Sequence, residues 1–361
     1  MRRMRALAFW MLLFERLAHT RGWRGLMWRD TRLPWPLLMI ALGRPWRAAG
    51  ALLVTLPVGL LAHMLLASIR RRTLDPQASL RPGICSDRIV QRIDIAMDEG
   101  HLPALYIVPH GSVRGAVAVL HGSGCHKTYY AWLHTDALLA AGCAVLLIDL
   151  DGHGENPRVQ QYPQIIDDAH ASVAWLRQRH AVVGLLGISL GGCIAARAVA
   201  DGARVDGLLL LETPVWLRFG DAERLIEARN LLRLFVLDVL RDSALQYQLA
   251  QIRDLVVAQR TPAIRAVIGT ADLIAALDLP GSLARCPLTP MLIYGARDAI
   301  VGSEQLAVAR TAAPTARVVL VPDAGHLTLM FHGTTRTHIT RWAAEMTNLL
   351  SVKPHDDPIR D

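Results

Sequence analysis

The chain has 361 residues, of which 52% are hydrophobic and 19% are charged, and its formal net charge is +8. This composition excludes a chain that is disordered throughout, because disorder requires low hydrophobicity together with high charge. The charge is unevenly distributed: residues 1–72 contribute +11, so residues 73–361 carry −3, which argues against a nucleic-acid-binding protein and favours contact of the N-terminal part with a membrane surface.

The longest uncharged run lies at residues 48–69 and reads AAGALLVTLPVGLLAHMLLASI. A helix of about 20 apolar residues can cross the hydrocarbon core of a bilayer, and five of the nine tryptophans precede the run, as expected of side chains that favour the interface. The sequence therefore predicts that residues 1–72 form an amphipathic and membrane-spanning anchor in contact with lipid, with the span at 48–69. A buried helix of a soluble protein and a hairpin lying in the interface are the alternatives. Arginines flank the span on both sides, so they favour neither orientation.

Residues 73–90 contain Pro76, Pro82 and Gly83 without periodicity, and we expect a linker there. From residue 91 to about 350, short apolar runs alternate with helical patterns. The predicted strands are 104–108, 116–120, 144–148, 182–186, 207–211, 291–294 and 317–321, and the predicted helices are 129–141, 163–179, 190–200, 303–313 and 335–350. Near-continuous apolar strands alternating with helices indicate an α/β fold, with a mostly parallel sheet covered on both faces.

One stretch interrupts the alternation. Residues 214–286 contain helix-length apolar patterns, such as 222–240, and no convincing strand. A helical insertion after a late strand predicts a lid over the carboxyl ends of the strands, where ligands bind in open α/β sheets. Residues 351–361 are predicted to form a polar tail.

Residues 182–192 read VVGLLGISLGG, a strand pattern followed by G-I-S-L-G and a helix of small residues. Between a strand and a helix, this motif predicts a sharp turn that holds the Ser189 hydroxyl clear of the sheet and at a helix N-terminus. Gly187 and Gly191 leave room for the turn. The alternative is a phosphate-binding or structural glycine turn.

A serine hydroxyl is a weak nucleophile that needs a base, and the base needs an orienting acid. Asp298 follows one predicted strand in the motif GARD, and His326 follows the next strand in PDAGH. The order Ser189, Asp298, His326 is the one expected for this turn. Glu212 directly follows the strand 207–211 and is the alternative acid, but the strand–turn context favours Asp298.

The oxyanion that forms when serine attacks an acyl group needs two hydrogen-bond donors. Leu190 N–H is the first candidate, because it follows the nucleophile. The second should come from the glycine-rich loop HGSG at 121–124, where Ser123 N–H is favoured over Gly124 N–H. We expect His121 to fix this loop by hydrogen bonding and Cys125 to line the pocket.

Five motifs carry a resemblance to a known superfamily: LHGSG at 120–124, IDLDGHGEN at 148–156, GISLGG at 187–192, GARD at 295–298 and AGH at 324–326. Over about residues 100–350 the chain resembles the α/β hydrolases. The resemblance implies a mostly parallel, eight-stranded sheet, with Ser189, Asp298 and His326 as nucleophile, acid and base. It also implies that His153 lies in a structural turn and is not catalytic.

The sequence thus favours a membrane-associated serine hydrolase that cleaves a carboxylic ester through an acyl-enzyme at Ser189. The apolar lid sequence, with Trp216 and Phe219 at its entrance, suits an apolar acyl substrate. A peptidase, thioesterase or acyltransferase would use the same triad. A non-catalytic binding protein on this fold is disfavoured because all three triad residues are present. No metal or nucleotide-phosphate motif occurs, and the five cysteines form no CxxC pair, so we predict no cofactor.

Overall fold

The structure is a computed structural model that describes residues 79–233 and 264–348. Four predicted segments lie wholly or partly outside these residues: the anchor at 1–72 with its span at 48–69, the first part of the linker at 73–78, the central part of the lid at 234–263 and the polar tail at 351–361. The helices within the two described ranges are all too short or too polar to cross a membrane.

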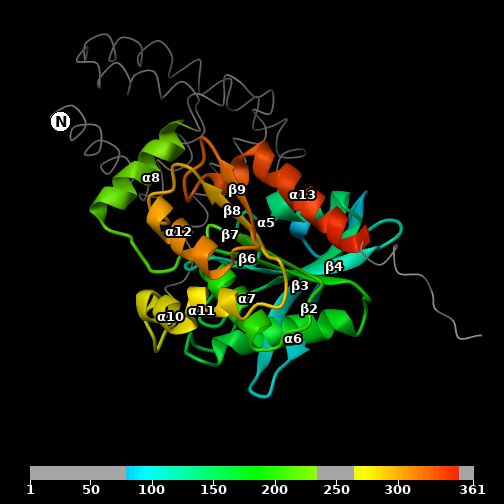
Figure 1. The fold of residues 1–361 in the computed structure, drawn as a ribbon. Helices are drawn as coiled ribbons and strands as arrows, with labels where there is room; N and C mark the ends of the chain where they lie inside the picture. Colours follow the sequence, from blue (N-terminus) through cyan, green and yellow to red (C-terminus); the bar gives the residue numbers. More distant parts are fainter. Residues whose placement is uncertain (1–78, 234–263, 349–361) are drawn as a thin grey trace, which may run out of the picture. The chain divides into compact units, whose positions relative to one another are not determined.

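The described residues form one sheet of nine strands in the order β1-β2-β3-β5-β4-β6-β7-β8-β9 (Figure 1). The strands are β1 (Gly83–Ile84), β2 (Arg88–Ala96), β3 (His101–Pro109), β4 (Gly115–Leu120), β5 (Cys143–Ile148), β6 (Val183–Ile188), β7 (Gly207–Leu211), β8 (Met291–Gly295) and β9 (Arg317–Val321). β2 pairs antiparallel with β1 and β3, and β3 pairs antiparallel with β5. All pairs from β5 to β9 are parallel, so the predicted mostly parallel sheet is confirmed.

The main difference from the expected sheet lies at its N-terminal edge. The seven predicted strands are all present, but β1 and β2 were not predicted, and the expected eight strands become nine. β1 and the first residues of β2 lie in the segment expected to be a linker. β2 mixes buried residues, such as Val90 and Ile95, with exposed ones, such as Arg92 and Ala96, and shows no regular alternation. The central strands β4 and β5 are buried along their whole length, which is why their apolar runs were recognisable.

Helices cover both faces of the sheet (Figure 1). The described helices are α5 (Ala131–Ala140), α6 (Ile165–Arg177), α7 (Leu190–Ala200), α8 (Asp221–Arg233), α10 (Thr270–Leu277), α11 (Leu279–Ala284), α12 (Ser303–Ala312), the short 3-10 helix η3 (Leu329–Phe331) and α13 (Gly333–Asn348). α5 packs against α13, whereas α6 and α11 pack against α7.

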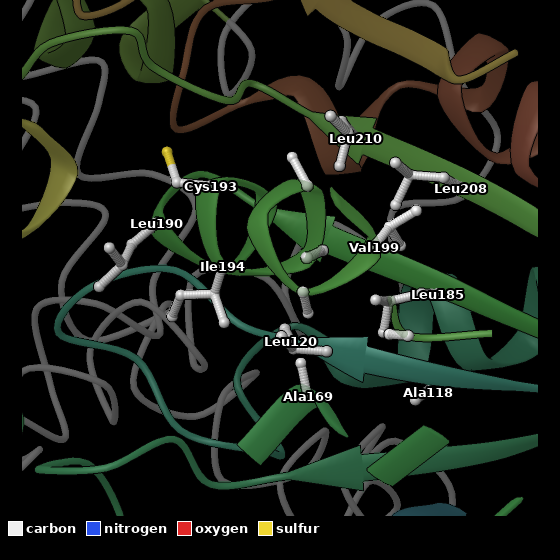
Figure 2. Packing of buried hydrophobic residues seen from close by; sticks show 14 of the residues in the cluster. Ala118, Leu120, Ala169, Leu185, Leu190, Cys193, Ile194, Val199, Leu208 and Leu210 are labelled. Atoms are coloured by element: carbon white, nitrogen blue, oxygen red, sulfur yellow. The ribbon is translucent and has the colours of Figure 1, made fainter. Parts of the chain in front are cut away.

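The core between the sheet and α7 is built from side chains that leave alternate positions of the central strands. Figure 2 shows Leu120 of β4, Leu185 of β6 and Leu208 of β7 in one buried cluster with Ile194 and Val199 of α7. These side chains are at most 2% exposed. Burial of this kind stabilises a fold by roughly 25 cal/mol per Å² of apolar surface, and it fixes α7 against the strand that precedes it.

The opposite face of the same strands is shaped by glycines. A Cβ atom at Gly184 of β6 would lie 2.9 Å from the Trp342 ring, and one at Gly207 of β7 would lie 2.9 Å from the Met346 sulfur. Trp342 and Met346 both belong to α13. The glycines therefore allow α13 to pack directly on the backbone of the sheet.

The regular elements described within 214–286 are the helices α8, α10 and α11, and the described part of this stretch pairs with another segment only through an isolated bridge between Ala266 and Gln160. α10 and α11 pack against α7, so they extend the helical layer beside the sheet. The expected lid over 214–286 stays a prediction, because its central part lies outside the described residues. α8 is the described element of this stretch that contacts the turns after β8 and β9.

The parallel register brings the carboxyl ends of the six strands β4 to β9 to one edge. Leu120 pairs with Gly187, Ile188 with Leu211, and Gly295 with Val321. The loops that follow β4, β6, β7, β8 and β9 consequently begin side by side. These are the loops that carry the predicted oxyanion donors, the nucleophile, the two candidate acids and the base.

Candidate active site

Ser189 occupies the turn between β6 and α7 in a conformation that few residues adopt. Its backbone has φ 52° and ψ −117°, and such a conformation costs on the order of 1–3 kcal/mol for a residue other than glycine. Its N–H donates to Leu211 O at 2.8 Å, and its own carbonyl accepts from Gly192 N–H at 2.9 Å. The neighbouring strand and the first turn of α7 therefore hold the serine in place.

Close packing explains the glycines of this turn. A Cβ atom at Gly187 would collide with the backbone of Gly191 and Gly192, and one at Gly192 would collide with the side chain of Thr213. A Cβ atom at Gly191 would overlap the carbonyl groups at the end of β4. The turn can be this tight only because these positions lack side chains.

We expect Gly191→Ala to lower the melting temperature and the solubility of the protein. The added methyl group meets rigid backbone, and overpacking of this kind typically costs about 1–3 kcal/mol or more. Gly333→Ala is the matched control, because a Cβ atom there lies 3.8 Å from the flexible end of Arg336. Thermal unfolding followed by circular dichroism measures both. Equal melting temperatures for the two variants would contradict the steric argument.

Ser189, His326 and Asp298 form one hydrogen-bonded line. His326 Nε2 lies 3.2 Å from Ser189 Oγ, and His326 Nδ1 lies 2.8 Å from Asp298 Oδ2. Asp298 Oδ1 accepts from the N–H groups of Ile300 at 2.8 Å and Val301 at 2.7 Å. With Nδ1–H donating to the carboxylate, Nε2 is free to accept the serine proton. The structure thus brings the three predicted residues together from three separate loops.

The surroundings of His326 favour its charged form. Burial lowers the pKa of the imidazole, but the charge of Asp298, the hydrogen bond to that carboxylate and the charge of Glu227 outweigh it, so the pKa lies above its ordinary value. A base must be neutral to accept a proton. Activity that depends on His326 is therefore expected to fall as the pH decreases through this raised pKa.

Glu212, the alternative acid, lies elsewhere in the network. It follows β7 with φ 52°, and its N–H donates to Ile293 O at 2.9 Å. No hydrogen bond joins its carboxyl to His326 within the described residues, where Oε1 has no partner. Burial and the charges of Asp298 and Glu227 raise the pKa of Glu212 well above its usual range. Of the two candidate acids, Asp298 is the one with a described hydrogen bond to His326, so the geometry favours Asp298.

The loop after β4 passes directly beside the nucleophile. A Cβ atom at Gly122 would lie only 3.3 Å from Ser189 Cβ. Leu190 is the first residue of α7, and the described residues offer no backbone acceptor to the N–H of Leu190 or of Ser123. The Ser123 hydroxyl lies 3.1 Å from Thr270 Oγ1 at the start of α10. The role of the Leu190 and Ser123 N–H groups as oxyanion donors stays a prediction.

His121 fixes the loop. Its Nε2 accepts from Leu150 N–H at 3.1 Å, so Nδ1 is the protonated nitrogen that donates to Gly122 O at 2.8 Å. Burial and the neighbouring His153 lower the pKa of His121 to about 3, which keeps the ring neutral. His153 lies against His121 with ring centroids 5.1 Å apart. Both rings thus support the turn after β5 and the loop after β4.

An ion pair that the sequence did not predict reinforces the same region. Lys127 Nζ lies 2.5 Å from Asp149 Oδ2, and Lys127 N–H donates to Asp149 Oδ1 at 2.7 Å. Both side chains are buried. The available signal was that Lys127 is one of only two lysines in the chain and follows the HGSG motif closely.

Cys125 borders the same loop. Its Sγ lies 3.7 Å from Ser123 O. Burial and the charge of Glu212 raise the pKa of the Cys125 thiol to about 12. A thiol with this pKa is a poor nucleophile at neutral pH, which agrees with the expected role in lining the site. The described residues contain no group of side chains suited to a metal ion.

Comparison with known proteins gives a match to the model of the alpha/beta hydrolase family over residues 117–336. The pimeloyl-[acyl-carrier protein] methyl ester esterase of Xylella fastidiosa (strain M23) is 27% identical over 246 residues, which cover 62% of this chain and 92% of the relative. The esterase of the same name from Serratia marcescens is 24% identical over 251 residues, covering 64% and 94%.

Solved structures share the fold. DcsB, in complex with its substrate analogue, superposes with a TM-score of 0.54 at 16% identity and covers 72% of this chain and 99% of its own. The Pyrococcus furiosus esterase Pf2001 superposes with a TM-score of 0.50 at 16% identity, covering 76% and 98%. These similarities concern the arrangement of strands and helices described above.

Proposed function

The chain belongs to the alpha/beta hydrolase family, and we propose that it is a serine esterase. It would cleave carboxylic esters through an acyl-enzyme at Ser189. The observation that carries the proposal is the line from Ser189 Oγ to His326 Nε2, at 3.2 Å, and from His326 Nδ1 to Asp298 Oδ2, at 2.8 Å. A nucleophile, a base and an orienting carboxylate in this geometry perform acyl transfer.

The reaction has two halves. Ser189 Oγ attacks the ester carbonyl carbon while His326 Nε2 takes the hydroxyl proton, and Asp298 stabilises the imidazolium that forms. The N–H groups of Leu190 and Ser123 bind the oxyanion. The bond to the alcohol oxygen then breaks, and the alcohol leaves with the proton from His326. Water then attacks the acyl-enzyme by the same steps, which releases the carboxylic acid and restores the Ser189 hydroxyl.

The substrate that fits best is an ester with an apolar acyl chain. Large apolar side chains stand partly exposed between β7 and α8, namely Trp216, Leu217 and Phe219, with exposed fractions of 40%, 38% and 43%. Apolar and aromatic side chains of this kind line acyl-binding sites. The relatives act on a methyl ester of an acyl chain carried by a protein, and a methyl ester is the bond that we propose for this enzyme. Thioesterase, peptidase and acyltransferase activities are the alternatives on the same triad.

A direct experiment combines labelling with substrate profiling. A fluorophosphonate probe should label the full-length protein, and mass spectrometry of the labelled peptide should place the adduct on Ser189. Hydrolysis of p-nitrophenyl esters and of fatty-acid methyl esters should increase with acyl length up to a limit set by the site. Absence of labelling would contradict the proposed nucleophile. Faster cleavage of matched thioesters or amides would indicate that the enzyme is a thioesterase or a peptidase instead.

For the location, we propose that the protein is attached to a membrane through residues 1–72. The support is the uncharged run at 48–69 and the +11 charge of the segment. Transfer of one large apolar side chain from water is worth about 1.5–3 kcal/mol, so a run of this length outweighs any electrostatic contact. Neither orientation of the hydrolase domain is favoured.

We expect the full-length protein to stay with membranes when they are washed in about 1 M salt, where the Debye length is only ~3 Å. Detergent should release it, and a chain without residues 1–72 should be found in the soluble fraction. Fractionation followed by immunoblotting measures the distribution. Release of the full-length protein by salt alone would contradict the anchor. A shortened chain that fails to fold would indicate instead that 48–69 is a buried helix of the hydrolase domain.

A further inference from the structure

One buried carboxylate of α8 joins the turn that carries the acid to the turn that carries the base. Glu227 Oε1 accepts from Ala299 N–H at 2.9 Å, and Glu227 Oε2 accepts from Leu327 N–H at 3.1 Å. Ala299 directly follows Asp298 in the chain, and Leu327 directly follows His326. The two contacts span 72 and 100 residues of sequence, so a single side chain fixes two distant turns relative to each other.

Asn230, three residues later on α8, strengthens the same connection. Its Nδ2 donates to Arg297 O at 2.9 Å and to Glu227 Oε1 at 3.3 Å. A Cβ atom at Gly325, the residue before His326, would lie 2.7 Å from Glu227 Oε2 and would also collide with Asn230. The helix therefore packs against the backbone on both sides of the acid and the base.

We propose that Glu227 is a positioning residue, which couples α8 to the active site by holding the Asp298 and His326 turns in register and by placing a second negative charge toward the imidazole. The inference rests on the proposed esterase function. It adds a residue that touches no reacting atom and acts through the two turns. It also gives α8, the helix at the entrance to the predicted lid, a direct connection to catalysis.

The charge of Glu227 is buried and has no ion-pair partner within the described residues. Glu227 is 1% exposed, and none of the described salt bridges includes it. Burying a carboxylate is costly unless hydrogen bonds or an opposite charge compensate. Backbone N–H groups and the Asn230 amide supply the hydrogen bonds. The opposite charge arises at His326 when it accepts the proton of Ser189.

The other titratable groups around His326 make the assignment specific. Asp298, from the turn after β8, is the hydrogen-bonded carboxylate. Glu212, from the end of β7, makes no described hydrogen bond to the imidazole, and burial and the nearby carboxylates raise its pKa. Cys125, from the loop after β4, is a neutral thiol, since burial raises its pKa. The arginines nearest this region are engaged elsewhere: Arg297 and Arg233 both pair with Asp323.

Asp298 and Glu227 are thus the two anionic groups that raise the pKa of His326 against the effect of burial. Removing the charge of Glu227 should lower that pKa. The acid limb of the pH profile of kcat/KM, which reports the base of the free enzyme, should then move to lower pH. A purely structural role would reduce the rate without moving the limb.

The test compares three variants of the full-length protein on a small activated ester. For Glu227→Gln we expect kcat/KM to fall by about 10-fold to 100-fold, as small misplacements of catalytic groups do, and the acid limb to move to lower pH. Glu227→Asp keeps the charge but cannot reach both N–H groups, so its kcat/KM should fall while the limb stays at the wild-type position. Asp221→Asn, an exposed charge removal on the same helix, should change neither quantity.

The pH dependence of fluorophosphonate labelling provides a second reading of the same ionisation without turnover. If the acid limb of Glu227→Gln lies at the same pH as the wild-type limb, the charge of Glu227 does not act on His326, and the electrostatic half of the proposal is wrong. An unchanged kcat/KM in Glu227→Asp would overturn the positioning part, even if Glu227→Gln fails to fold. A wild-type protein that neither labels nor hydrolyses esters would contradict the proposed function itself, whereas an active wild type with insensitive Glu227 variants would contradict only this inference.

Discussion

Replacing Ser189 with alanine is expected to abolish ester hydrolysis, with a reduction of kcat of about 10⁶-fold, the size seen when a triad nucleophile is removed from another serine hydrolase. Alanine keeps the Cβ atom that already fits the turn at φ 52° and removes only the hydroxyl. That hydroxyl contacts His326 Nε2 at 3.2 Å. The backbone bonds of the turn to Leu211 and Gly192 do not involve the side chain, so the fold should persist.

The measurement is kcat for the purified variant on a long-chain p-nitrophenyl ester, with the melting temperature recorded on the same sample. Ser303→Ala is a suitable control, because Ser303 is an exposed residue at the start of α12, far from the nucleophile in sequence. It should retain wild-type activity. A Ser189→Ala protein that folds and still hydrolyses the ester at a wild-type rate would show that Ser189 is not the nucleophile.

The central strands were predictable because parallel strands buried on both faces are apolar along their whole length. β5, with the sequence CAVLLI, is buried at every position. β2 escaped prediction for the opposite reason: it pairs antiparallel at the edge of the sheet and exposes Arg92 and Asp94. Its pattern depends on which face meets solvent, and the sequence alone does not provide that information.

The residues of the candidate site also differ in whether the sequence alone could predict them. Ser189, Asp298 and His326 each follow an apolar strand, so chain order and strand ends were enough to bring them together. Glu227 and Lys127 could not be predicted in this way, because their partners lie in loops distant in the sequence. Helix α8 carries charged residues at six of its 13 positions, and nothing in its sequence separates the buried Glu227 from the solvated Asp221.

The choice between the two candidate acids depended on the structure, since Glu212 and Asp298 both follow strands of the sheet. Asp298 bonds to His326 Nδ1 at 2.8 Å and holds its own turn through Ile300 and Val301. Glu212 lacks a described bond to the imidazole, and burial and the nearby carboxylates raise its pKa. The two carboxyl groups therefore differ in their contact with the base.

Asp298→Asn is accordingly expected to reduce kcat/KM by about 10⁴-fold, the loss measured for the same replacement in another serine hydrolase triad. The asparagine carbonyl can still accept from Ile300 and Val301 N–H, which leaves the amide NH₂ facing His326 Nδ1. The imidazole must then carry its proton on Nε2, where it cannot accept the proton of Ser189.

Glu212→Gln keeps the shape of a side chain that has no described hydrogen bond to His326, so its kcat/KM should stay within about 10-fold of wild type. Both variants are compared on the same activated ester, with melting temperatures to exclude unfolding. The ratio of the two losses decides the assignment: a larger loss in Glu212→Gln would make Glu212 the acid. We expect the loss in Asp298→Asn to exceed the loss in Glu212→Gln by about 10³-fold or more. Of the two carboxyl groups, Asp298 is the one in hydrogen-bond contact with His326 Nδ1, the nitrogen that must keep its proton while Ser189 attacks.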